Sequence, residues 1–474
     1  AGKRPEFVCD YKLGFTASGQ LKAVKARYYQ NGGSWNDAAY TNLQAILGAS
    51  DGCYFSPNFY ADAVSCYTNL PGSTYCRAPG ELPGSFFAEH MMEAIAHKVG
   101  KDPTEVKQLN FYQKGQITPG GQPLNYFSIP SIWTDLQQES NYQSRLAAVK
   151  TYNAQNRWTK RGIAQVPVKY GLLWSGEKFN ALIDVYPDGS VNITHAGIES
   201  GQGINTKVAQ VVAYKLGCDL SYINVSRSST ITSPNATVTG GSVTSELCST
   251  AALDAAQQIF DKMKPIRALH PNASWPELVA KAWGSSLILQ AVGWTNKPIG
   301  LPPFQYMSYG SAITEVYVDM LTGQTEILRS DVLFDAGTSL NPLLDVSSVQ
   351  GAFIMGVGTY LTERLEFDET TGRLTTDGTW EYKPPSSMDV PIEFNVTLLP
   401  HAPNPKGFLS SKASGEPPYI LSCSIFYAVK HALYEARKSN NNGQPVPYFD
   451  LNAPATIDVR LMNSGISSDQ FSIN

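Results

Sequence analysis

The sequence has no run of apolar residues that approaches the roughly 18 to 20 positions needed by a membrane helix. Charged residues make up only 16% of the chain and hydrophobic residues 42%, which is unlike disordered proteins and coiled coils. Lys and Arg number 36 against 40 Asp and Glu, so the basic excess that binds nucleic-acid phosphates is missing. At about 150 residues per domain, the sequence predicts a globular chain of two to four packing units that binds neither nucleic acid nor membrane.

Cysteine is scarce, with seven residues scattered along the chain and no CxxC pair. An odd, dispersed set of thiols is typical of reduced proteins and predicts a cytoplasmic location. Five Asn-x-Ser/Thr sequons, the first at Asn192, indicate secretion instead, but a chain rich in Ser, Thr and Asn contains such triplets by chance. The opening AGKRPEFVCDY has no initiator Met and no apolar signal core, so we interpret it as cut from something longer.

Signatures of metal sites and hydrolases are also missing. The six histidines form no HExxH or other zinc pattern, and the sequence contains no GxSxG elbow. A metal site built by protein ligands is therefore not evident, and any metal must arrive already held by an organic cofactor.

Periodicity in the sequence predicts an α+β fold, with antiparallel hairpins and mixed sheets packed with helices. Alternation predicts hairpins at 11–30, 179–197 and 312–334, the second around a Pro-Asp-Gly turn. Helical spacing predicts helices at 85–99, 203–217, 246–264, 346–361 and 418–436. Residues 101–150 are polar and rich in Pro and Gly, which predicts a boundary between packing units there.

The most informative short segment is KASGEPP at 412–418, which precedes an apolar helix. Gly415 permits close approach of the backbone to a ligand, and Pro417 and Pro418 pre-set the first helical turn. The carboxylate of Glu416 at this rigid junction could act as a general base, or it could cap the positive helix end.

Two loops of small residues could hold a polar ligand. ESGQGINT at 199–206 and TVTGGSV at 237–243 each lead into a predicted helix. Exposed amides at such turns suit an anion or a heterocycle, although two ordinary helix N-caps explain the same residues. A further turn, CRAPGE at 76–81, carries Arg77, which could bind an anion or form a structural salt bridge.

These four segments, in this order, resemble the molybdenum-cofactor-binding region of the xanthine dehydrogenase/aldehyde oxidase family. The resemblance covers almost the whole chain and rests on TNLP…RAPG at 68–80, GIESGQGINTK at 197–207, SPNATVTGGS at 233–242, SYGSAITEVYVD…SLNP at 308–342 and SKASGEPP at 411–418. It implies a molybdenum-cofactor-binding domain of the aldehyde oxidase type that is N-terminally incomplete. Residues 1–125 would be the remainder of the first molybdopterin-binding subdomain, 126–160 a linker, and 161–474 the second subdomain, which carries Glu416.

The resemblance implies a hydroxylase that uses Mo-molybdopterin, with Glu416 as the base to a molybdenum-bound hydroxyl and water as the oxygen source. Arg77 and Gly241 would lie near the molybdenum, without a direct side-chain ligand. Met355 stands where the family usually has Gln, and because a thioether cannot donate, one cofactor hydrogen bond is expected to be lost. The implied cofactor-binding residues are Ser200, Gly201, Gln202, Gly203, Gly240, Gly241, Ser242, Val243 and Met355.

Substrate preference is inferred from three positions that match the family's substrate channel: Pro79, Trp174 and Ser175. In the purine-oxidising branch two aromatic rings clamp the substrate and an Arg anchors it. Pro79 occupies one ring position here, and the Arg position aligns near Ala45, so purines should bind poorly. The resemblance favours an aldehyde oxidase, notably of the arthropod type, acting on aldehydes or N-heterocycles. A xanthine dehydrogenase with a diverged pocket, and a catalytically silent homologue with a binding or structural role, are the alternatives.

The family's proteins are longer and carry two iron–sulfur domains and an FAD domain ahead of this region. Seven cysteines cannot supply two 2Fe–2S centres, because each centre needs four thiolates at characteristic spacing. We therefore expect 2Fe–2S and FAD on upstream domains or partner chains, and by resemblance a homodimer.

Overall fold

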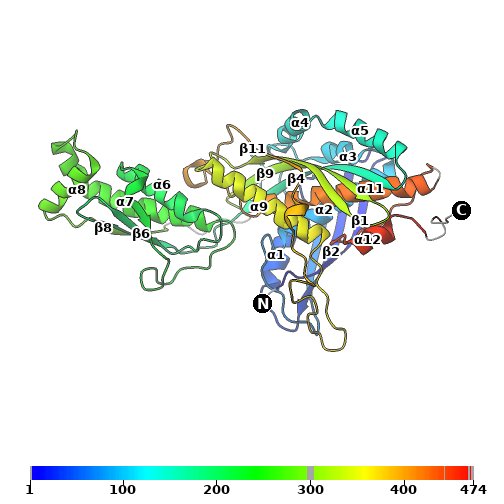
Figure 1. Cartoon of the computed structure of the whole chain (residues 1–474), viewed down its shortest axis with the longest axis horizontal. Helices are drawn as coiled ribbons and strands as arrows, with labels where there is room; N and C mark the ends of the chain where they lie inside the picture. Colours follow the sequence, from blue (N-terminus) through cyan, green and yellow to red (C-terminus); the bar gives the residue numbers. More distant parts are fainter. Residues whose placement is uncertain (1–2, 296–303, 442, 468–469, 471–474) are drawn as a thin grey trace.

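The computed structural model describes all residues except 1–2, 296–303, 442, 468–469 and 471–474. The described chain has the predicted α+β fold and forms two lobes (Figure 1). The small lobe consists of the elements between Asn180 and Trp294, and the large lobe consists of the remaining elements.

The large lobe contains two sheets. The first has the order β1-β2-β3, from β1 (Phe7–Phe15), β2 (Leu21–Gly33) and β3 (Asn58–Tyr67). The second has the order β11-β10-β9-β4, from β4 (Thr159–Leu172), β9 (Tyr306–Asp319), β10 (Thr325–Asp335) and β11 (Glu393–Leu398). Because β4 and β9 pair antiparallel along their whole length, the small lobe is an insertion between two neighbouring strands.

Helices cover both sheets of the large lobe. They are α1 (Ala39–Ala49), α2 (Glu81–Val99), α3 (Pro103–Asn110), α4 (Ile129–Glu139), α5 (Tyr142–Gln155), α9 (Pro342–Leu361), α10 (Pro417–Leu421), α11 (Cys423–Asn440) and α12 (Ile457–Asn463), with short 3-10 turns η2 (Ser387–Asp389) and η3 (Phe408–Ser410).

The first turns of α11 are buried on every side, as expected of a helix in a core, and Gly162 of β4 lets α11 approach the sheet closely. A Cβ at Gly162 would collide with the carbonyl oxygen of Ala428.

The small lobe packs helices on a sheet of order β7-β6-β5-β8. Its strands are β5 (Asn180–Val185), β6 (Val191–His195), β7 (Ile223–Val225) and β8 (Gln290–Trp294), and its helices are α6 (Ile204–Leu216), α7 (Thr244–Leu269), α8 (Trp275–Gly284) and the turn η1 (Leu220–Tyr222). The predicted Pro-Asp-Gly hairpin is β5–β6, and Asp188 fixes its turn by accepting a hydrogen bond from the Ser190 amide at 2.9 Å.

Two expectations need correction. The predicted helix at 418–436 is two helices, α10 and α11, that meet at Ser422. The segment 126–160, expected as a linker, contains α4 and α5, and α4 buries Ile132 and Trp133 completely. The Pro- and Gly-rich run TPGGQP at 118–123 lies ahead of this segment, which itself contains no glycine and one proline. That residue, Pro130, lies in the first turn of α4, where proline is tolerated. The division of the chain into two subdomains at this segment stays a prediction.

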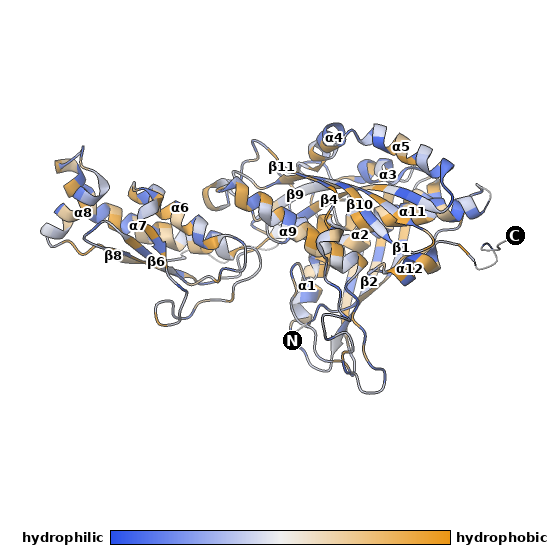
Figure 2. Ribbon diagram, in the orientation of Figure 1, coloured by the Kyte–Doolittle hydropathy of each residue, from blue (hydrophilic) through white to orange (hydrophobic). Residues whose placement is uncertain are grey.

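Apolar residues concentrate where α9 and α10 pack on one another and α10 and α11 pack on the second sheet. Figure 2 shows that α9 is apolar over most of its length. In the described ranges, no helix combines the length and the apolarity required to cross a bilayer.

Candidate functional site

Glu416 lies at the N-terminal end of α10, with 9% of its surface exposed. Its side chain forms no cap hydrogen bond to α10. Instead, Oε1 accepts a hydrogen bond from the Ala78 amide at 2.9 Å, and Oε2 accepts from the hydroxyls of Tyr170 at 3.0 Å and Ser242 at 2.9 Å. The carboxylate is therefore oriented by donors from three distant parts of the chain, and the helix-cap interpretation does not describe it.

The donors around Glu416 leave its carboxylate partly available. An ionised carboxylate offers about four acceptor positions, two on each oxygen. Oε2 accepts two hydrogen bonds from the described chain, while Oε1 accepts one. Oε1 thus retains one position for a proton or a hydrogen bond from a ligand.

Ser242 connects the small lobe to Glu416. Its hydroxyl donates to Oε2 and also accepts a hydrogen bond from the Glu416 amide at 3.0 Å. Ser242 has φ 58°, in the left-handed region that residues other than glycine rarely adopt, at a cost on the order of 1 kcal/mol. Gly415 makes room for this contact, because a Cβ at Gly415 would lie 2.8 Å from the Ser242 hydroxyl oxygen.

Arg77 binds the backbone of Gly415, the residue before Glu416. Its Nε donates to the Gly415 carbonyl at 2.8 Å, Nη2 donates to the same oxygen, and Nη1 lies 3.9 Å from the sulfur of Met355 in α9. Burial lowers the pKa of Arg77, and the nearby Glu416 charge opposes that shift. The structure thus brings Arg77, Ser242, Met355 and Glu416 together.

A second carboxyl group, Glu81, lies beside this cluster in the first turn of α2. Its Oε2 is buried and has no hydrogen-bond partner among the described residues. Burial raises the pKa of Glu81 to about 7, and the neighbouring charge of Glu416 adds to the shift. The pKa of Tyr170 is also raised well above its ordinary value, first by burial and then by Glu416.

The two loops of small residues lie side by side, as joint binding of one polar ligand would require. The hydroxyl of Thr239 in one loop accepts a hydrogen bond from the Ile198 amide in the other at 3.0 Å. Gly240 and Gly241 are exposed, and a Cβ at Gly240 would meet no atom within 4 Å. The loop at 237–243 therefore leaves open space for a ligand beside Ser242, while Val243 is buried at the start of α7.

The other loop differs from the expectation of exposed amides. The carboxylate of Glu199 accepts hydrogen bonds from the amides of Gly201 at 3.1 Å and Gly203 at 2.9 Å. Its other oxygen accepts from the Asn205 amide in the first turn of α6 at 3.2 Å, so Glu199 caps this helix. Gln202 folds back on its own loop, where Oε1 accepts from the Ser200 amide at 2.7 Å. An anion at this helix end would have to displace Glu199, so the amides here are not a ready anion site.

The three residues expected to line a substrate channel occupy different surroundings. Pro79 is half-buried beside Ala78, and Trp174 is buried two residues beyond the end of β4. Ser175 is exposed, and its amide donates to Glu177 at 2.7 Å. Ala45 of α1 packs against Gly80, next to Pro79.

Sequence reasoning missed Tyr170, Glu81 and the Ala78 amide. Tyr170 is one of several aromatic residues in strands and carries no local signal. The Ala78 amide is invisible in sequence because it depends on a backbone conformation with φ 53°. Glu81 was quoted within the CRAPGE turn, but nothing in its spacing indicated burial.

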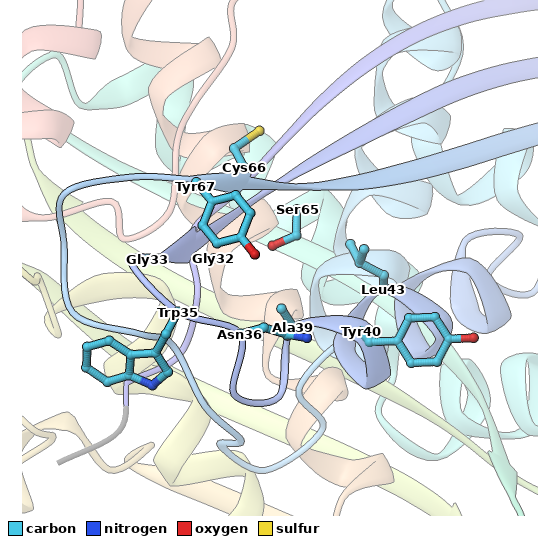
Figure 3. A pocket seen from close by; sticks show the side chains of 10 residues that line it. All are labelled: Gly32, Gly33, Trp35, Asn36, Ala39, Tyr40, Leu43, Ser65, Cys66 and Tyr67. Atoms are coloured by element: carbon cyan, nitrogen blue, oxygen red, sulfur yellow. The ribbon is translucent and has the colours of Figure 1, made fainter.

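A cavity of about 240 Å³ lies beside α1, and its lining includes none of the predicted residues (Figure 3). The exposed rings of Trp35, Tyr40 and Tyr67 border it. Its lining consists of Gly32, Gly33, Trp35, Asn36, Ala39, Tyr40, Leu43, Ser65, Cys66 and Tyr67. Among the residues that the structure describes, no group of three or more His, Cys, Asp or Glu side chains could hold a metal ion.

Comparisons with protein families identify two matching segments, both described as molybdopterin cofactor-binding domains, at residues 1–111 and 135–391. The chain is 38% identical over 479 residues to a xanthine dehydrogenase/oxidase of Gallus gallus, covering 99% of this chain and 35% of that protein. It is 37% identical to a xanthine dehydrogenase of Calliphora vicina, covering 96% of this chain and 34% of that one. The chain thus spans about a third of the length of these curated relatives.

Solved structures share the fold. Quinoline 2-oxidoreductase from Pseudomonas putida 86 superimposes with a TM-score of 0.84 at 19% identity, covering 98% of this chain and 62% of that one. The aldehyde oxidoreductase from Desulfovibrio desulfuricans superimposes with a TM-score of 0.80 at 22% identity, covering 98% of this chain and 49% of that one.

Proposed function

The chain belongs to the xanthine dehydrogenase/aldehyde oxidase family through its molybdopterin-cofactor-binding domains, and we propose that it is the molybdenum-hydroxylase portion of an aldehyde oxidase. It oxidises aldehydes, and also N-heterocycles, with water as the oxygen source. An aldehyde and water give a carboxylic acid, two protons and two electrons. The observation that carries the proposal is the buried Glu416 carboxylate, which three donors orient while one acceptor position of Oε1 stays available.

The cofactor would be held between the two loops of the small lobe and α9. The residues assigned to it are Ser200, Gly201, Gln202, Gly203, Gly240, Gly241, Ser242, Val243 and Met355, with Arg77 near the metal. The open space at Gly240 supports this assignment, whereas Gln202 and Glu199 would have to rearrange. When bound, the group supplies a two-electron acceptor and acidifies the water that provides the oxygen.

Glu416 acts as the general base. Its carboxylate accepts the proton at Oε1, while the Tyr170 and Ser242 hydroxyls hold Oε2 in place. Arg77 donates to the carbonyl oxygen of the preceding Gly415, and the Glu416 amide donates to the Ser242 hydroxyl, so the backbone of the base is anchored as well as its side chain. A base that is fixed in this way needs little rearrangement to meet its proton.

Aldehydes suit the assigned channel better than purines do. By the resemblance, Trp174 and Pro79 occupy the two ring positions of the family's substrate clamp, and Pro79 supplies no aromatic face. Ala45, packed against Gly80, offers no charge to anchor a purine. Purine oxidation is the second candidate, because the similar curated proteins are named xanthine dehydrogenases. Faster turnover of xanthine than of benzaldehyde by the intact, cofactor-loaded protein would favour that second candidate.

The decisive variant is Glu416→Gln in the intact, cofactor-loaded protein. Loss of the base should lower aldehyde turnover by roughly 10²- to 10⁴-fold, with molybdenum and pterin content unchanged. Glu369→Gln is the matched control, because Glu369 is exposed in a loop of the large lobe. Turnover retained in Glu416→Gln would remove Glu416 from the mechanism.

A catalytically silent homologue is the remaining alternative, motivated by Met355. Absence of molybdenum and pterin from the well-folded native protein would support that alternative. For the active protein we propose 2Fe–2S and FAD groups on upstream domains or partner chains as electron acceptors, together with a homodimeric state and a cytoplasmic location.

A further inference from the structure

Arg4, which precedes β1, extends its side chain to the loop that holds Glu416. Its Nη2 donates to the carbonyl oxygen of Arg77 at 2.7 Å and to the Tyr419 hydroxyl at 3.2 Å. Its Nη1 lies 3.3 Å from the carbonyl oxygen of Ala78, to which it also donates. One guanidinium group therefore binds two successive carbonyls of the Arg77–Ala78 loop.

This loop adopts a conformation that needs external support. Ala78 has φ 53° and is fully buried, and such a conformation persists only where surrounding contacts determine it. The rigid fork of an arginine matches two neighbouring oxygens, whereas a lysine would bind as a point charge. On the other side of the loop, the Ala78 amide donates to Oε1 of Glu416. The loop is thus held between Arg4 and Glu416.

We propose that Arg4 is a positioning residue for Glu416, because it binds the carbonyls of Arg77 and Ala78 and so keeps the Ala78 amide on Oε1. This inference rests on the proposed role of Glu416 as the base. It assigns a task in the site to a side chain 412 residues away in the sequence, ahead of the first strand.

The charge of Arg4 provides a second, separable effect. Burial raises the pKa of Glu81, and the Arg4 charge is one of the influences that lower it again. Removal of the charge should raise the pKa of Glu81 further. A lysine at position 4 should keep the charge effect but lose part of the hold on the two carbonyls.

Hydrogen exchange of the Ala78 amide in the cofactor-free chain tests the positioning role. We expect Arg4→Met to accelerate this exchange at least about 10-fold relative to the β5 amides of the small lobe, since one lost hydrogen bond of about 1.4 kcal/mol gives that factor. Arg4→Lys should accelerate it less and leave the pKa of Glu81 in place, whereas Arg4→Met should raise that pKa. Lys3→Met is the matched control, because Lys3 lies over the Phe367 ring and should affect neither quantity.

Ala78 exchange that stays within about twofold of wild type in Arg4→Met overturns the inference. If Arg4→Met does not fold, Arg4→Lys decides, and Ala78 exchange in that variant that is no faster than in wild type overturns the inference. Aldehyde turnover of the intact, cofactor-loaded protein separates this inference from the proposed function. If Ala78 exchange is accelerated in Arg4→Met but the intact, cofactor-loaded wild type has no aldehyde turnover, the positioning role stands and the proposed function is refuted. If Ala78 exchange is unchanged in Arg4→Met but the intact wild type is active, the positioning role is refuted and the proposed function stands.

Discussion

Replacement of Glu81 by Gln should stabilise the protein, and the gain should grow with pH. The Glu81 carboxyl is buried with one oxygen unpartnered, and its pKa in the folded state is about 7, above the ordinary value of 4.5. Below pH 4.5 both the folded and the unfolded states hold the proton, so the group adds no pH-dependent cost. As the pH rises towards 7, the unfolded state loses its proton first, and wild type is progressively destabilised.

The size of the effect follows from the two pKa values. Linkage between 4.5 and about 7 gives a stability difference of about 1 kcal/mol at pH 5 and about 3 kcal/mol at pH 8. Glutamine keeps the shape of the side chain and carries no charge at either pH. The Glu81→Gln variant should therefore gain more at pH 8 than at pH 5.

Urea unfolding of both proteins at the two pH values measures this difference, with circular dichroism as the signal. Glu369→Gln, at an exposed position, should show no comparable pH-dependent gain. An equal gain for Glu81→Gln at pH 5 and pH 8 would refute the reasoning, because it would mean that Glu81 ionises alike in the folded and unfolded chains.

Two further substitutions test the packing around the site and behind it. Gly415→Ala should lower aldehyde turnover on the order of 100-fold, because the new methyl group would lie 2.8 Å from the Ser242 hydroxyl oxygen and displace that hydroxyl from Glu416. Gly351→Ala in α9 is the control, because its methyl group would meet no atom within 4 Å and should leave turnover intact. Lys107→Met should lower the free energy of unfolding by about 3 to 5 kcal/mol, since the buried Lys107 ammonium is paired with both Glu89 at 3.1 Å and Glu93 at 2.9 Å. The exposed Lys114→Met is its control, and an equal effect in both variants would contradict the ion-pair account.

Much of the fold could be predicted from periodicity, because alternation and helical spacing are local properties. The hairpins β1–β2, β5–β6 and β9–β10 and the helices α6 and α7 follow from such patterns. The helices α4 and α5 could not be predicted, because Pro and Gly signals nearby outweighed the apolar spacing of α4. The pairing of β4 with β9 also has no local signature, since the small lobe separates the two strands.

The candidate site divides in the same way. Glu416, Ser242 and Arg77 were proposed from the sequence because glycines and prolines mark their loops, and their roles stay predictions. Tyr170 and Arg4 were not, because their importance depends on contacts with residues 246 and 73 positions away. Glu199 was quoted in its loop, but its capping of α6 depends on the direction of its side chain, which sequence does not specify.

The wide separation of the donors to Glu416 has a kinetic consequence. Ala78, Tyr170 and Ser242 lie 338, 246 and 174 positions from Glu416 along the chain. Contacts of such long range form slowly, because large loops must close before any of them is made. The cluster should therefore be among the last parts of the molecule to assemble during refolding, after the two sheets of the large lobe and the sheet of the small lobe have formed.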